Sequence, residues 1–133
     1  MHPTLLETLS AWLLIIAFAI SLIYELWRAT AKAGASRHDS MRAFLVTNLW
    51  LYVVAVIVIV LLLMGVPVAA WVGLIFAALI VIVSVFYYNP VIMIERKPGL
   101  VDWIEDLVYT GLLFVVVAFL WLEVAGFALS SRP

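Results

Sequence analysis

Residues 44–88 read FLVTNLWLYVVAVIVIVLLLMGVPVAAWVGLIFAALIVIVSVFYY, a stretch of this chain without a single charged side chain. About 20 apolar helical residues suffice to cross a bilayer core about 30 Å thick. The stretch therefore predicts two spans, residues 44–64 and 68–88. Gly65 suits a left-handed helix end and Pro67 suits the first turn of the helix that follows. The pair predicts a tight, uncharged helical hairpin.

Two further apolar runs, residues 5–27 and 107–129, flank this hairpin. Apolar side chains occur on every side of all four runs, so the alternation of a transmembrane β-strand is missing. We predict an all-α integral membrane protein with four transmembrane helices in an up-down bundle, short loops and no soluble domain. The whole chain, residues 1–133, forms one domain. No basic segment precedes the first run, which we expect to be a retained span, not a signal peptide.

The composition excludes several classes of function. Of 133 residues, 68% are hydrophobic, far above the roughly 45–50% of soluble domains, and the mean hydropathy is +1.28. The net charge is −1 without a basic patch, so we expect no nucleic-acid partner. The absence of cysteine removes thiolate metal sites and cysteine nucleophiles.

Lysine and arginine residues predict the orientation of the spans. Six of them lie in the first and third loops, namely Arg28, Lys32, Arg37, Arg42, Arg96 and Lys97, whereas the opposite side has only Arg132. Cytoplasmic loops carry an excess of such residues. We expect a location in the cell (inner) membrane, with the first and third loops cytoplasmic and both termini outside.

Local signals predict where the connections lie. Asn89-Pro90 disfavours helical geometry at Asn89 and Pro98-Gly99 favours a turn, so residues 89–101 should be irregular. Asp39 or Ser40 is a plausible N-cap for the second helix.

Glu25 and Glu123 stand out as carboxylates inside the apolar runs. An ionisable group in the hydrocarbon costs a few kcal/mol and usually marks a pair or a pathway. The interpretation favoured for Glu123 is an interfacial position beside Trp121, and the alternative is an intramembrane pair or proton site. The favoured interpretation for Glu25 is an i, i+3 pair with Arg28 near water, and the alternative is a coupling group of a transporter.

Other polar side chains have structural interpretations as well. Asn48 is expected to link helices by a hydrogen bond, with binding of a ligand head group such as a quinone ring as the alternative. Asp102, Glu105 and Asp106 lie at the start of the fourth helix, where acids cap free amides and complement the helix dipole. Asp102 is the predicted cap of a box closed by Glu105. A specific cation or partner contact is the alternative for this group.

Small residues in the third span form the clearest packing signal. They are Ala69, Gly73 and Ala77, at i, i+4 and i+8, followed by Ser84. Such a stripe lets another helix approach closely, although alanine-rich spans also produce it by chance. We expect the third span to form a tight helix seam.

Few polar side chains are available from which to infer the function. The two histidines, His2 and His38, lie outside the spans, so we expect no haem or other cofactor bound by this chain alone, no metal site and no catalytic residues. We therefore predict a non-catalytic structural or assembly subunit of a larger membrane complex, in energy metabolism or membrane oxidation. Its partners would be larger membrane subunits and lipids, in a hetero-oligomer. The alternative is a small homo-oligomeric transporter or channel that uses a membrane carboxylate.

Overall fold

Helices make up nearly all of the computed structural model, which describes residues 2–34, 36 and 39–126. The first span is α1 (Leu5–Thr30) and the fourth is α5 (Leu100–Val124). The second span is a continuous run of α2 (Met41–Ala43), η1 (Phe44–Asn48) and α3 (Leu49–Met64), and the third joins α4 (Ala69–Val83) to η2 (Ser84–Met93). Four helices are long and apolar enough to cross a membrane and no strand occurs in the described residues. The predicted four-helix membrane bundle is confirmed.

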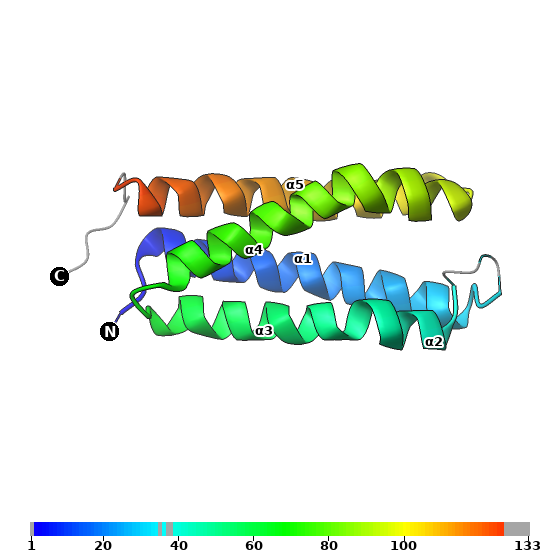
Figure 1. Cartoon of the computed structure of the whole chain (residues 1–133), viewed down its shortest axis with the longest axis horizontal. Helices are drawn as coiled ribbons and strands as arrows, with labels where there is room; N and C mark the ends of the chain where they lie inside the picture. Colours follow the sequence, from blue (N-terminus) through cyan, green and yellow to red (C-terminus); the bar gives the residue numbers. More distant parts are fainter. Residues whose placement is uncertain (1, 35, 37–38, 127–133) are drawn as a thin grey trace.

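The helices run up and down, and α1 and α4 each pack against both α3 and α5 (Figure 1). We call the end at Gly65 the hairpin end, and the end that contains residues 31–34, 39–40 and 96–99 the basic end. At the hairpin end α3 and α4 lie side by side, but they separate towards the basic end (Figure 1). The two halves of the bundle are therefore packed differently.

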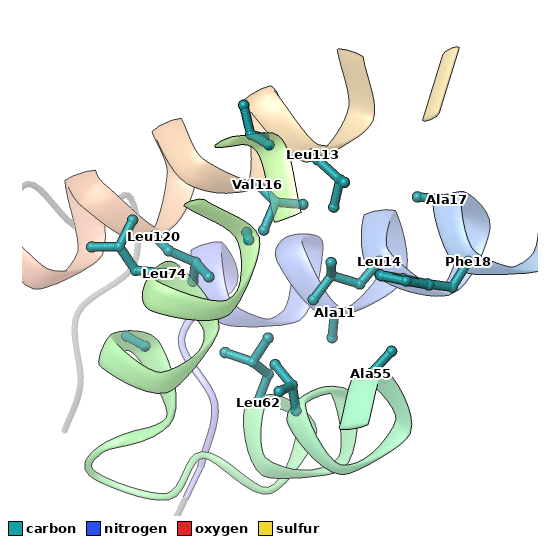
Figure 2. Packing of buried hydrophobic residues seen from close by; sticks show 14 of the residues in the cluster. Ala11, Leu14, Ala17, Phe18, Ala55, Leu62, Leu74, Leu113, Val116 and Leu120 are labelled. Carbon is teal, nitrogen blue, oxygen red and sulfur yellow. The ribbon is translucent and has the colours of Figure 1, made fainter. Parts of the chain in front are cut away.

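The apolar core fills the half of the bundle nearer the hairpin end. Its fully buried members include Leu14, Leu62, Leu113 and Leu120, one or two from each of α1, α3 and α5 (Figure 2). Inside a bilayer, lipid tails are as apolar as leucine, so close van der Waals packing holds such helices together.

Polar caps begin and end the helices. Thr4 and Glu7 form a capping box at α1, and the Ser40 side chain accepts a hydrogen bond from the Ala43 amide. Of the two caps predicted for the second helix, Ser40 is the one that forms. Gly65 ends α3 with a φ of 68°, as its sequence context predicts. The predicted Asp102 cap is wrong by one turn, because Gly99 is the N-cap and Asp102 accepts its amide hydrogen bond at 2.8 Å.

The prediction of an irregular stretch over residues 89–101 is largely wrong. The third span continues through Pro90 as the ten-residue π-helix η2, and the non-helical connection is confined to residues 96–99. Proline has no N–H and its ring clashes with the carbonyl four residues earlier in an α-helix. The wider π-helical turn accommodates this clash, so the helix persists where an α-helix would break.

Candidate functional site

A network of buried charged side chains closes the basic end of the bundle. We call Glu25, Arg28, Asp39, Arg96 and Asp102 the ion network. Arg28 holds Asp39 through two contacts, Nε to Oδ1 at 2.9 Å and Nη2 to Oδ2 at 2.6 Å, and its Nη1 lies 3.5 Å from Asp102. Arg96 donates from Nη1 to both oxygens of Glu25 at 3.1 Å, and its Nε lies 3.0 Å from Asp39. The network thereby joins α1, both loops of this end and α5.

Tyrosine hydroxyls complete the ion network. Tyr24 donates to Asp102 at 2.5 Å, and Tyr88 donates to Glu25 at 3.2 Å while accepting from Arg96 at 2.8 Å. Burial alone would lower the pKa of Arg96, but the neighbouring Tyr88, Glu25 and Asp39 raise it above its usual value. The guanidinium therefore stays charged although its side chain is only 3% exposed.

The predicted pair of Glu25 with Arg28 is wrong. Glu25 binds Arg96, and Arg28 turns to Asp39 and Asp102. An exposed i, i+3 pair is worth only a few tenths of a kcal/mol, whereas a buried charge must have close partners. Glu25 has a better partner in Arg96, 71 positions away in the chain. Arg28 has a better partner in Asp39, 11 positions away. Sequence spacing within one helix does not reveal them.

A cavity of about 290 Å³ lies between the spans, beside the ion network. Much of its wall is aromatic: Trp50, Tyr52, Tyr87, Tyr88 and Tyr109. Its backbone wall includes both π-helices, with Asn48 from η1 and Ser84 from η2 among the lining residues. π-Helical turns are rare and occur frequently at functional sites. Two of them, on separate spans, border the same space.

Several polar groups face this cavity without a hydrogen-bond partner. Tyr109 is 9% exposed and Ser84 is 7% exposed, and neither side chain makes a hydrogen bond within the described residues. The carboxylate of Glu105 also lines the cavity without an ion pair among those residues, while Asp106 has a side-chain hydrogen bond with Asn89. Tyr52 is occupied by Ser21, whose hydroxyl lies 2.9 Å away. The unused groups are available to a molecule in the cavity.

The cavity opens on the outer surface of the bundle between the second and third spans. Lining residues at this side are exposed, with Trp50 at 60%, Tyr87 at 53% and Val83 at 49%. Trp50 belongs to α3, and Val83 and Tyr87 belong to α4 and its continuation η2. These two spans separate towards the basic end (Figure 1). Because these surfaces are apolar and belong to helices long enough to cross a membrane, we expect the mouth to face the bilayer.

The predicted site residues other than Glu123 fall into three places. Glu25, Asn48, Glu105, Asp106 and Ser84 line the cavity, and Asp102 belongs to the ion network. The other members of the small-residue stripe lie on the buried side of α4.

At Gly73 an added Cβ would lie 2.8 Å from Leu120 of α5 and 3.3 Å from Leu62 of α3. The stripe therefore forms a close approach within the chain.

Glu123 lies apart, at the hairpin end of α5. It accepts a hydrogen bond from the Thr4 hydroxyl at 2.6 Å and is partly buried. Glu7, which the sequence analysis did not single out, is fully buried one turn into α1. The spacing of Thr4 and Glu7 matches a capping box, a signal that would have identified its role.

Comparison of the chain with protein-family models, with curated proteins and with solved structures finds no match. The arrangement of its own residues is the basis for a functional proposal.

Proposed function

We propose that this protein is a non-catalytic membrane protein that binds a small amphipathic molecule in the cavity. The observation that supports this proposal best is the set of unpaired polar groups, Glu105, Tyr109 and Ser84, facing a space of about 290 Å³. Ligand sites are concave and mostly apolar, with a few polar groups that orient the ligand. The cavity has this composition.

The wall of the cavity favours one kind of occupant. Its space of about 290 Å³ is open at the mouth, so molecules from the surroundings compete to fill it. A lipid chain entering from the bilayer would fill the volume but leave Glu105 and Tyr109 without polar partners. A molecule with a polar head and an apolar body satisfies both parts of the wall.

Within this proposal, the chain acts as a small subunit of a larger membrane complex. The described chain has hardly any mass outside its spans, and apolar side chains cover its outer faces, including Trp12, Val46, Ile57 and Phe114. Such faces suit packing against lipids and larger membrane subunits. The complex would supply the chemistry, and this chain would hold the small molecule for it.

A transporter is the second candidate, because three carboxylates, Glu25, Glu105 and Asp106, line the cavity. A pathway would also have to pass the hairpin half, where Leu14, Leu62, Leu113 and Leu120 are fully buried against one another's helices (Figure 2). That packing favours binding over transport. Ion-coupled flux in liposomes that is lost in Glu25→Gln would favour the transporter instead.

Purification in a mild detergent followed by mass spectrometry tests the proposal. Ser84→Trp fills the cavity, and Ile82→Trp, on the same helix but 52% exposed, is the matched control. The wild type and Ile82→Trp should retain a small molecule other than bulk lipid, and Ser84→Trp should lose it. Equal retention by both variants would contradict binding in the cavity.

The same preparation tests the subunit part of the proposal. We expect larger, unrelated chains in fixed ratio to this one in the wild type and in Ser84→Trp, because residue 84 faces the cavity and not a partner. A pure homo-oligomer would contradict this part and leave the cavity result standing.

A further inference from the structure

We infer that the cavity selects a lipophilic organic cation, with Glu105 as the opposite charge and the aromatic side chains as the wall around the cationic group. This inference rests on the proposed function and specifies the chemical class of its ligand. It depends on the charge balance of the cavity, on the unpaired hydroxyl groups and on the position of the mouth.

Acidic side chains outnumber basic ones in the wall of the cavity. Its wall contains Glu25, Glu105 and Asp106 but no lysine or arginine. Arg96, on the far side of Glu25, neutralises that carboxylate with two contacts at 3.1 Å. Glu105 has no such partner among the described residues, and Asp106 has only the neutral Asn89. A cation would give the Glu105 carboxylate the close opposite charge that a buried ionised group needs, whereas an anion or a neutral ligand would not.

The aromatic wall suits a cation as well. Faces of tyrosine and tryptophan attract ammonium and guanidinium groups, most strongly where water is excluded. The guanidinium of Arg96 already lies over the ring of Tyr88, with its Cζ 5.8 Å from the ring centroid. Tyr109, held edge-on by Phe18 at 5.5 Å between ring centroids, is four residues from Glu105 and therefore on the same face of α5. Its hydroxyl and the Glu105 carboxylate approach the same space.

The position of the cavity mouth favours ligands that are soluble in lipid. Exposed lining residues Trp50, Val83 and Tyr87 lie between two spans, so a ligand reaches the cavity from within the bilayer. Inorganic cations do not partition there. An organic cation with an aromatic or aliphatic body does, and its body replaces the lipid that the mouth would otherwise admit.

Isothermal titration of the detergent-purified protein with benzyltrimethylammonium tests the inference. This probe carries a permanent charge, and benzenesulfonate is an anion of similar size. We expect the wild type to bind the cation and not the anion, and Glu105→Gln to weaken binding of the cation about tenfold or more, the equivalent of about 1.4 kcal/mol. Glu95→Gln removes an exposed carboxylate outside the cavity and should leave the affinity unchanged.

Glu105→Asp keeps the charge and is the control for misfolding of Glu105→Gln. It should bind the cation more tightly than Glu105→Gln when both variants elute from size exclusion like the wild type. Equal affinity of wild type and Glu105→Gln, or equal binding of cation and anion, would overturn the inference.

The outcomes also separate this inference from the proposed function. If a neutral molecule is retained and Ser84→Trp expels it, the cavity is a binding site but not one for cations. If neither probe binds and no small molecule is retained, the proposed function fails together with the inference.

Discussion

Replacing Arg96 by methionine is the most informative perturbation of this protein. Arg96 contacts Glu25, Asp39 and Tyr88, and its side chain is 3% exposed. Methionine keeps much of the volume and removes the charge. Its effect therefore reports what the buried cation contributes to the bundle.

The expected loss of unfolding free energy follows from the contacts that remain in Arg96→Met. Asp39, fully buried, still has the two contacts with Arg28 and a hydrogen bond from Ser36 at 2.8 Å. Glu25, 5% exposed, keeps only the Tyr88 hydroxyl at 3.2 Å. Removing one partner of a buried ion pair costs about 3–5 kcal/mol, because the other charge stays buried and uncompensated. We expect Arg96→Met to lower the free energy of unfolding by this amount, mainly through Glu25.

Reversible unfolding of the purified protein in mixed micelles, titrated with a denaturing detergent, measures this free energy. The double variant Arg96→Met/Glu25→Gln should be at least as stable as Arg96→Met, because the uncompensated charge is gone. Lys97→Met, an exposed cation in the same loop, is the control and should stay within about 0.5 kcal/mol of the wild type. A loss below about 1 kcal/mol for Arg96→Met, or a double variant less stable than it, would refute the reasoning.

Two pairs of glycine variants test the packing. Gly73→Leu should lower the unfolding free energy by about 1–3 kcal/mol or more through overpacking, because an added Cβ would lie 2.8 Å from Leu120. Gly111→Leu is the control, because a Cβ added at Gly111 has no other atom within 4 Å. Similar unfolding midpoints for these two would count against the seam. Gly65→Ala and Gly34→Ala both place alanine at positive φ, but only Gly65 faces the amino-terminal backbone. A larger loss of stability is expected at Gly65, and an equal loss at both would contradict that contact.

The architecture was predictable because the bilayer imposes it on the sequence. Apolar runs of sufficient length and a left-handed turn at Gly65 leave few alternatives to a four-helix bundle. The ends of the spans were less predictable. The rule that proline breaks an α-helix holds for Asn89-Pro90, but a π-helix satisfies the same constraint without ending the span. Sequence rules for α-helices do not predict this π-helix.

Some residues of the candidate site could be identified from the sequence, but not the way in which the fold brings them together. Glu25, Asn48 and Glu105 were recognisable as polar residues in or beside spans, but they come from different helices and meet only in the folded bundle. Tyr88 and Tyr109 were not singled out from the sequence, since an aromatic side chain in a span gives no sign of which way it faces. The ion network depends on contacts up to 74 positions apart, which hydropathy patterns do not encode.

Glu25 connects the two features of the basic end. One side of its carboxylate is bound by Arg96 in the ion network, and the residue also lines the cavity beside Tyr88. The network fixes the ends of the spans by charge, so the space beneath it does not have to be closed by apolar packing for the bundle to hold together. At the hairpin end, where such charges are fewer, leucine and small residues bring the helices into close contact. A bundle held by packing at one end and by ion pairs at the other can keep an apolar cavity with a few polar groups open between them, as the proposed binding site requires.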